Sequence, residues 1–260
     1  MIDFYKYQGT GNDFILIDNS KDDFKANKVD YAIKWCDRKF GIGADGLIFI
    51  EPSTKGDFLM DFYNPDGSQS FCGNGSRCSV AFAKFLGIIK DQTNFEAIDG
   101  IHQAVISDKH VKIEMQQYGA IESIGNDHFI DTGSPHYVAY RNGVNENIVE
   151  YGKSIRYSDR FKTKGTNVNL IAEKGDRNIE IWTYERGVEA ETLACGTGAT
   201  ACGISFAQKH NIDKGIIEVK AQGGHLRIHL EASKNDKVYQ NIWLEGPAEF
   251  VFKGVIEDEN

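Results

Sequence analysis

Hydrophobic and polar residues alternate along two segments of the chain. In residues 111–116 the odd positions are Val, Ile and Met and the even positions are Lys, Glu and Gln. In residues 225–230 the even positions are Leu, Ile and Leu, and the odd positions are His, Arg and His. A period of two is typical of a strand that is buried on one face only. We therefore expect half-buried strands at both places.

Two other segments are apolar on nearly every side. Residues 79–86 and 199–207 each follow a glycine-rich turn, and the first is followed by Gly87. A helix without a polar face is typical of a buried position, and a glycine just past the last turn commonly ends a helix. We therefore predict two buried helices here, and further helices at about 27–39 and 145–157.

The chain also repeats itself at long range. Four glycine-rich turns recur in the same order with offsets of 122 to 124 residues: 10–15 with 132–137, 43–48 with 165–170, 72–75 with 195–198, and 100–102 with 224–226. These matches indicate two homologous lobes, residues 1–118 and 119–260, related by a pseudo-twofold axis. We expect a mixed α/β (α+β) fold. Each lobe would be a curved, mostly antiparallel sheet wrapped around a central buried helix, with the active site in the cleft between the lobes.

Composition limits the partners and the compartment. The chain has 29 Lys and Arg against 38 Asp and Glu, a net charge of −9, which disfavours nucleic acid or an anionic membrane surface as a partner. A hydrophobic content of 41% without an apolar run of membrane-helix length predicts a soluble globular protein. The N-terminus lacks the pattern of a secretory signal and the five cysteines are an odd number, so we expect free thiols in the cytoplasm.

Two common cofactor and metal motifs do not fit the chain. Residues 41–46 read Gly-Ile-Gly-Ala-Asp-Gly, but they lead into a strand-like run instead of opening a helix, so we predict a tight turn and no dinucleotide site. The cysteine spacings differ from those of zinc sites, and no metal is expected. We expect Cys36, Cys78 and Cys202 to be buried and inert.

Cys72 and Cys195 stand apart from the other cysteines. Each directly precedes Gly-x-Gly at the start of a predicted helix. A helix N-terminus lowers the pKa of a thiol, and glycines let backbone N–H groups approach a carboxylate. A single copy is equally consistent with a cysteine that fills a tight turn, but two matched copies favour function. Facing each other across a twofold axis, they would suit a two-base racemase or epimerase, in which one thiolate removes an α-proton and the opposite thiol returns one.

The motifs resemble the diaminopimelate epimerase family over nearly the whole chain. The similar segments are residues 9–14, 64–68, 72–78, 133–136, 165–169, 185–187 and 194–198. The resemblance implies an enzyme, independent of any cofactor, that interconverts LL- and meso-diaminopimelate in the route to lysine and peptidoglycan precursors. It also implies a homodimer.

The resemblance implies roles for individual residues as well. Cys72 and Cys195 would be the two acid/base groups. Substrate contacts would come from Asn12, Asn64, Gly73, Asn74, Asn167, Glu185, Arg186, Gly196 and Thr197. His136 and Glu185 would tune the thiol pKa values. Without the resemblance, the asparagines would be interpreted as turn formers beside glycine.

Two positions depart from the family pattern. Ser134 stands where many members have Asn, and Gly46 where some have Gln, which bears on recognition of the distal end of the substrate. Three other functions stay open at this stage: an epimerase of another amino acid, a non-catalytic amino-acid-binding protein, and a dithiol redox protein. Binding alone would need neither cysteine, and a redox dithiol would leave the anion-binding glycines without a purpose.

Overall fold

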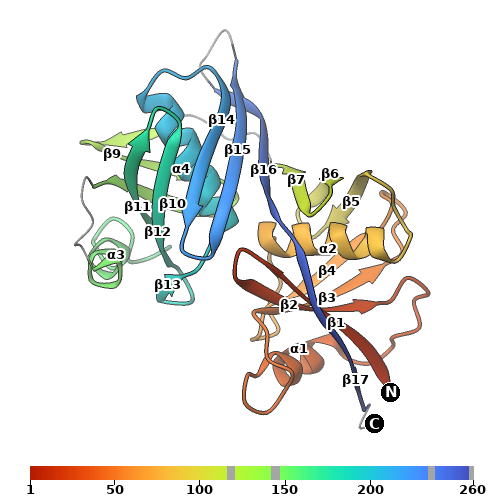
Figure 1. The fold of residues 1–260 in the computed structure, drawn as a ribbon. Coiled ribbons are helices and arrows are strands. Elements are labelled where there is room, and N and C mark those ends of the chain that lie inside the picture. Colours follow the sequence, from red (N-terminus) through yellow and green to blue (C-terminus); the bar gives the residue numbers. More distant parts are fainter. Residues whose placement is uncertain (116–120, 142–146, 234–237, 258–260) are drawn as a thin grey trace. The chain divides into compact units, whose positions relative to one another are not determined.

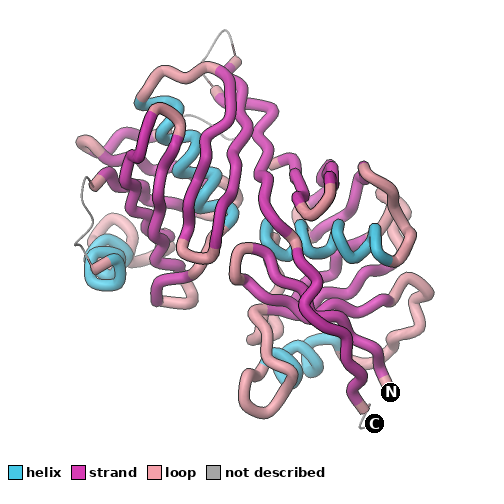
Figure 2. The backbone as a smooth tube through the Cα atoms, in the orientation of Figure 1, coloured by secondary structure: helices cyan, strands magenta, loops and turns pink. Residues whose placement is uncertain are grey.

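The structure is a computed structural model that describes residues 1–115, 121–141, 147–233 and 238–257. Backbone contacts divide the chain into two compact units. The first is formed by Met1–Ile113 together with Gly246–Asn260, and the second by Glu114–Glu245. Each unit is rich in strands and has one long helix packed against its sheet (Figures 1 and 2).

The first unit contains eight strands among its described residues. They are β1 (Ile2–Gly9), β2 (Asn12–Asp18), β3 (Gly46–Glu51), β4 (Leu59–Tyr63), β5 (Gln92–Ala97), β6 (Gly100–Ser107), β7 (His110–Glu114) and β17 (Glu249–Ile256). Their pairing order is β17–β1–β2–β3–β4–β5–β6–β7. The pairs β2–β3 and β4–β5 are parallel and the others are antiparallel.

The second unit is built in the same way. Its strands are β8 (Glu122–Ile124), β9 (Asp127–Asp131), β10 (Pro135–Tyr140), β11 (Asn167–Gly175), β12 (Asn178–Glu185), β13 (Ala190–Thr192), β14 (Lys214–Ala221), β15 (Gly224–Ala232) and β16 (Tyr239–Pro247). The pairing order is β8–β9–β10–β11–β12–β14–β15–β16, with β13 beside the end of β12. The pairs β10–β11 and β12–β14 are parallel.

From β1 and from β9 onward, the two units follow the same sequence of parallel and antiparallel pairings. The helices fall at matching points of this sequence. In the first unit α1 (Lys28–Cys36) precedes β3 and α2 (Gly73–Phe85) precedes β5. In the second unit α3 (Ile148–Arg156) precedes β11 and α4 (Gly196–Lys209) precedes β14. The predicted α/β class, with mostly antiparallel sheets around central helices, is confirmed.

The second central helix contacts more strands than the first. Helix α2 packs on β1 to β4 and β6, and α4 packs on β9 to β12, β14 and β15. Ten of the residues of α2 and eleven of those of α4 are buried, as their apolar composition predicted. Both helices begin earlier than the apolar runs indicated, because the Cys-Gly-x-Gly segments form their first turns.

The two shorter helices are also confirmed, within narrower bounds than predicted. Asn27 caps α1 and Asn147 caps α3, each with its side-chain oxygen accepting a backbone N–H. Helix α1 ends at Cys36 instead of about residue 39 because the chain turns back there, with the N–H of Gly43 donating to the Trp35 carbonyl at 2.9 Å. Residues 145 and 146 of the predicted third helix lie outside the described residues.

Strand β3 lies between two hydrophobic cores of the first unit. Ile48 and Ile50 pack in one core with residues of α2, whereas Leu47 and Phe49 pack in a second core with Trp35 of α1. A strand covered on both faces has no polar face, which explains its continuous apolar run. Strands β7 and β15, by contrast, alternate between buried and more exposed positions, as expected.

The C-terminal strand differs from the prediction. The sequence repeat placed all of residues 119–260 in the second lobe, but β17 pairs with β1 and belongs to the first unit. In the second unit β8 pairs with β9 in the corresponding position. The C-terminal segment thus supplies the strand next to β1 and covers the edge of β1. The predicted boundary at 118–119 falls outside the described residues.

Among the residues that the structure describes, no helix combines the length and apolar character needed to cross a bilayer.

Candidate functional site

Cys72 is the N-cap residue of α2. Its backbone is extended, and its Sγ accepts the N–H of Gly75 at 3.4 Å. The residue is partly exposed, and its sulfur lies next to the backbone N–H groups of the first helix turn. A thiolate at this position is stabilised by these N–H groups and by the helix dipole.

Two asparagines predicted for the site contact this helix start. Asn74 donates from Nδ2 to the Asn12 Oδ1 at 3.1 Å, and the Cys72 Sγ lies 3.9 Å from the same oxygen. The Asn12 amide is fixed because its Nδ2 donates to Asp45 Oδ2 at 2.6 Å. Arg38 in turn donates to Asp45 at 2.7 Å. The structure thus brings Cys72, Asn12 and Asn74 together.

A buried cation lies behind Cys72. The Arg77 side chain has no exposed surface, and it donates to the Gly73 carbonyl, the Thr10 hydroxyl and the Pro247 carbonyl at 3.2–3.3 Å. Burial lowers the pKa of Arg77 to about 10, and the charges of Cys78 and Cys72 act in the opposite direction. The attraction is mutual, so a cationic Arg77 favours the thiolate of Cys72.

Asn64 and Gly46 have structural roles in the same unit. The Asn64 amide donates to Ser68 and Ser70 at 3.1–3.2 Å and so holds the loop that leads into Cys72. A Cβ atom on Gly46 would lie 2.2 Å from the Phe62 ring. The departure from the family pattern at Gly46 therefore has a steric reason, because Phe62 occupies the space of a side chain.

Cys195 is the N-cap residue of α4, as Cys72 is of α2. Its Sγ accepts the N–H of Gly198 at 3.4 Å, and the Thr197 hydroxyl lies 3.4 Å from the same sulfur. The Thr197 carbonyl accepts a hydrogen bond from Thr132 at 2.9 Å, which holds this turn against the segment before β10. The second helix start therefore has a hydroxyl group at the place where the first has an asparagine amide.

His136 reaches this turn from β10. Its Nε2 lies 3.0 Å from the Thr197 Oγ1, and its Nδ1 lies 3.0 Å from the Asn169 Nδ2. The ring is fully buried, and this burial, together with the charge of Arg186, lowers the pKa of His136 to about 3. His136 is therefore neutral near pH 7, and its contact with Cys195 runs through Thr197.

Asn167 organises the remaining predicted residues of the second unit. Its Nδ2 donates to Ser134 Oγ at 2.9 Å and its Oδ1 accepts the N–H of Arg186 at 2.8 Å. Ser134 thus uses its hydroxyl within the protein. The Arg186 side chain is exposed and donates to the Lys164 carbonyl at 3.0 Å. Glu185 is the last residue of β12 and is partly exposed.

Burial of a neutral histidine makes stability depend on pH. Because the pKa of His136 falls from 6.5 to about 3 on folding, the unfolded chain binds a proton below pH 6.5 that the native state does not bind. Lowering the pH from 7 to 4.5 should therefore cost wild-type protein about 2–3 kcal/mol of unfolding free energy relative to His136→Leu. Urea unfolding of both proteins at several pH values measures this. A difference that stays constant with pH would contradict the buried neutral ring.

Three buried side chains near these helix starts were not singled out from the sequence. Arg77 lies inside a segment that resembles the family, and a charged residue among apolar helix positions was the available signal. For Asn169 the available signal was a polar residue between the apolar residues Val168 and Leu170. Thr183 gave no signal, because threonine is common in strands. The prediction that Cys36, Cys78 and Cys202 are buried is confirmed. Burial raises the pKa of Cys36 and Cys78 to about 12 and raises that of Cys202, which disfavours their reactive thiolate form.

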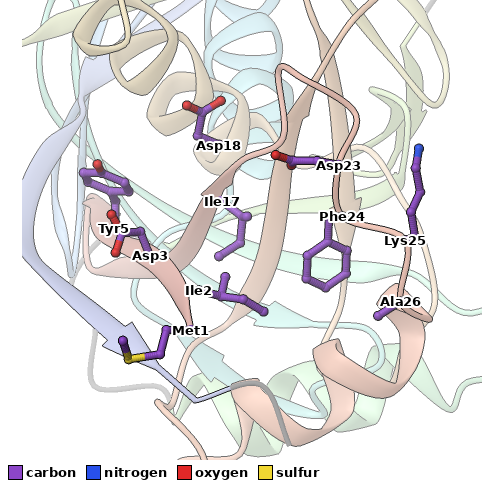
Figure 3. Close-up of a pocket in the computed structure, with 10 residues that line it drawn as sticks. All are labelled: Met1, Ile2, Asp3, Tyr5, Ile17, Asp18, Asp23, Phe24, Lys25 and Ala26. Atoms are coloured by element: carbon purple, nitrogen blue, oxygen red, sulfur yellow. The ribbon is translucent and has the colours of Figure 1, made fainter. Parts of the chain in front are cut away.

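A surface pocket of the first unit lies elsewhere. Figure 3 shows it between the N-terminal strand and the loop before α1, lined by Asp3, Asp18, Asp23, Phe24 and Lys25 among others. None of the predicted site residues lines it. Within the described parts of the chain, no cluster of three or more His, Cys, Asp or Glu side chains has the arrangement of a metal site.

Comparison with known proteins gives a consistent result. The family model for diaminopimelate epimerase matches residues 4–120 and 128–251. The chain belongs to the diaminopimelate epimerase family. It is 46% identical over 255 residues to the diaminopimelate epimerase of Flavobacterium psychrophilum, covering 97% of this chain and 99% of that one. It is 36% identical to the enzyme of the same name from Aquifex aeolicus, covering 99% of both chains. The protein is therefore an isomerase of the epimerase type.

Solved structures share this fold at low sequence identity. A PhzF-family phenazine biosynthesis protein of Bacillus anthracis matches with a TM-score of 0.74 at 14% identity, covering 98% of this chain and 99% of that chain. A hydroxyproline epimerase of Agrobacterium vitis matches with a TM-score of 0.69 at 12% identity, covering 97% and 91%. The diaminopimelate epimerase family thus shares its architecture with this wider group of structures.

Proposed function

We propose that the protein interconverts LL- and meso-2,6-diaminopimelate, with Cys72 and Cys195 as its two acid/base groups and without any cofactor. The observation that carries the proposal is the matched geometry of two helix starts. In each unit a partly exposed cysteine caps the central helix and accepts an N–H at 3.4 Å. Family membership and the names of the relatives support the substrate.

The reaction needs one cysteine as thiolate and the other as thiol. The thiolate takes the α-proton, and the electron pair left on the α-carbon delocalises into the adjacent carboxylate. The thiol then gives its proton to the opposite face of that carbon, which inverts it. No atom is gained or lost, and the two sulfurs end with exchanged protonation states. The N–H groups of Gly73, Asn74, Gly196 and Thr197 are suited to stabilise the charge that develops on the carboxylate.

The remaining predicted contacts suit the distal end of the substrate. An exposed guanidinium on Arg186 can pair with a carboxylate in bidentate geometry. Asn12, Asn64 and Asn167 supply amide groups, and Glu185 can accept from an ammonium group. Because Asn12 is held by Asp45 and Asn167 by Ser134, both amides are already oriented before substrate arrives.

The test is to incubate reduced protein with LL-diaminopimelate in D2O without added cofactor. Deuterium should appear at the α-carbon together with the meso isomer. Cys202→Ala is the matched control because Cys202 lies on α4 but is buried, and it should leave exchange unchanged. Absence of exchange in folded protein with free thiols would reject diaminopimelate as the substrate. Exchange on another amino acid in a substrate panel would then identify an epimerase of different specificity.

We also propose that the protein is a homodimer that pairs through β17. This strand pairs with β1 and exposes Phe250, Val251, Phe252 and Val255, each at least 45% accessible. Apolar side chains on both faces of a terminal strand suit burial against a second, antiparallel copy of the same strand. Light scattering should give the mass of two chains, and Val251→Lys with Val255→Lys should give one. A wild-type monomer at micromolar concentration would contradict this.

The proposed chemistry favours the cytoplasm as the compartment. Both cysteines must be free thiols, as they are in the structure, which suits the reducing cytoplasm. The acidic net charge of −9 supports a small amino acid as the partner of this site, with neither nucleic acid nor a membrane surface involved.

A further inference from the structure

A line of buried polar side chains runs across the sheet of the second unit towards Cys195. Thr183 on β12 donates from its hydroxyl to the Asn169 Oδ1 on β11 at 2.9 Å, and the two residues are direct cross-strand partners. Asn169 Nδ2 lies 3.0 Å from the His136 Nδ1 on β10. His136 Nε2 lies 3.0 Å from the Thr197 Oγ1, which lies 3.4 Å from the Cys195 Sγ.

The direction of these hydrogen bonds is determined by their chemistry. Asn169 Nδ2 also faces the Tyr137 carbonyl at 3.4 Å, and a carbonyl can only accept, so the amide nitrogen is on that side. Thr183 donates to the amide oxygen on the other side. The His136 Nδ1 must then accept, which puts the ring proton on Nε2. Nε2–H donates to the Thr197 Oγ1, and the Thr197 hydroxyl proton is left to point at the sulfur.

Burial keeps this direction from changing. Thr183, Asn169 and His136 are each at most 2% exposed, so water does not compete for their hydrogen bonds. The same burial keeps the His136 ring neutral, and a neutral ring has one donor and one acceptor. A protonated ring would donate from both nitrogens and would clash electrostatically with the Asn169 amide.

The corresponding place in the first unit is apolar. A Cβ atom on Gly75, in the first turn of α2, would meet Met60 and Ile48 at 3.2–3.3 Å. A Cβ atom on Gly198, in the first turn of α4, would meet the Asn169 Oδ1 at 2.7 Å and the His136 ring at 3.3 Å. Apolar side chains beneath the first turn of the central helix are therefore sufficient for this fold. Buried polar groups cost free energy unless they are all paired, so their presence at this place under α4, where α2 has Met60 and Ile48, indicates a function.

We propose that Asn169 and Thr183 are positioning residues which, through His136, hold the Thr197 hydroxyl as a hydrogen-bond donor to the thiolate of Cys195. The inference rests on the proposed two-cysteine function and deepens it. Cys195 receives a backbone N–H and a directed hydroxyl, whereas Cys72 has the buried guanidinium of Arg77 behind it. The two thiolates are thus stabilised by different means.

The first test measures how fast each cysteine reacts with iodoacetamide, resolved by peptide mass spectrometry. Thiolate is the reacting form, so loss of one charge-assisted hydrogen bond should slow alkylation of Cys195 about 10- to 100-fold. We expect this loss in Asn169→Leu and in Thr197→Val, with a smaller loss in Thr183→Val. The rate at Cys72 should stay unchanged in all three and serves as an internal reference.

Matched variants separate this role from a merely structural one. Thr197→Ser keeps the hydroxyl and should restore the Cys195 rate. Thr200→Val removes a buried hydroxyl one turn along the same helix, where it donates to the Gly196 carbonyl, and should leave the rate unchanged. An unchanged Cys195 rate in both Asn169→Leu and Thr197→Val would overturn the proposal, as would equal rates in the Ser and Val variants of Thr197.

A second readout requires no variant at position 197. Nitrogen-15 NMR of the His136 ring should show a protonated Nε2 and an unprotonated Nδ1 in the wild-type protein, and both tautomers in Asn169→Leu. An Nδ1–H ring in the wild type would overturn the assigned direction. Alkylation and NMR do not depend on turnover of diaminopimelate. The experiments therefore distinguish an error in the proposed line of hydrogen bonds from an error in the proposed substrate.

Discussion

Alanine at either Cys72 or Cys195 should reduce epimerisation of diaminopimelate by about 10²–10⁴-fold, the usual contribution of a positioned acid or base. Each reaction needs both groups, because one removes the α-proton and the other delivers a proton to the opposite face. The two variants should therefore be comparably inactive in epimerisation, although only one cysteine is lost in each. The stability of both should fall by about 1 kcal/mol at most, because each partly exposed side chain supplies one cap hydrogen bond to its helix.

Proton exchange in D2O separates the two roles. From LL-diaminopimelate, one variant should lose α-proton exchange and the other should retain slow exchange without inversion, and from the meso isomer the pattern should reverse. This reversal assigns each cysteine to one face of the substrate. Epimerisation at more than a tenth of the wild-type rate in either variant, with the protein folded, would contradict the two-cysteine mechanism.

Arg77→Met should destabilise the first unit by about 3 kcal/mol. The substitution keeps much of the side-chain volume but removes three hydrogen bonds, so that the Gly73 and Pro247 carbonyls and the Thr10 hydroxyl each lose a buried donor. An unsatisfied buried acceptor costs about 1–3 kcal/mol. Removal of a fully buried charge, whose pKa burial lowers to about 10, offsets part of this cost.

Urea unfolding measures the loss, and Arg227→Met is the control. Arg227 forms ion pairs with Glu218 and Glu245 at 2.9–3.2 Å, but its side chain is 47% exposed, so its replacement should cost about 1 kcal/mol or less. Arg77→Met should also slow alkylation of Cys72 and leave that of Cys195 unchanged. A destabilisation equal to that of the control would show that other groups or water satisfy the three acceptors.

Much of the fold can be predicted from local pattern and repetition. Alternation located β7 and β15, and apolar runs located the cores of α2 and α4. The exact helix starts were harder to predict, because glycine is a poor helix former and only the cap geometry places Gly73 and Gly196 inside the first turn. Strand β17 was assigned to the wrong lobe because sequence order does not record which edge of a sheet still lacks a partner.

The candidate site divides in a similar way. The two cysteines were identified from sequence because their chemistry depends on a local feature, a helix start with glycines. Asn12 and Asn74 also lie in recognisable segments, but their contact joins residues that are distant in sequence. In the sequence, Arg77 and Asn169 look like ordinary polar residues. Their importance follows from burial, because an unpaired polar group costs little free energy in water and much in a protein core.

The sequence by itself determined the fold class, the internal repeat and the two matched cysteine turns, since each depends on residue spacing along the chain. Only the tertiary structure decided that β17 completes the first sheet and that the first turns of α2 and α4 pack on different kinds of side chain. Under α2 lie Met60 and Ile48, and under α4 lie Asn169 and His136. The direction of a buried hydrogen bond depends on which donors and acceptors surround it in three dimensions, and that information is absent from any local segment.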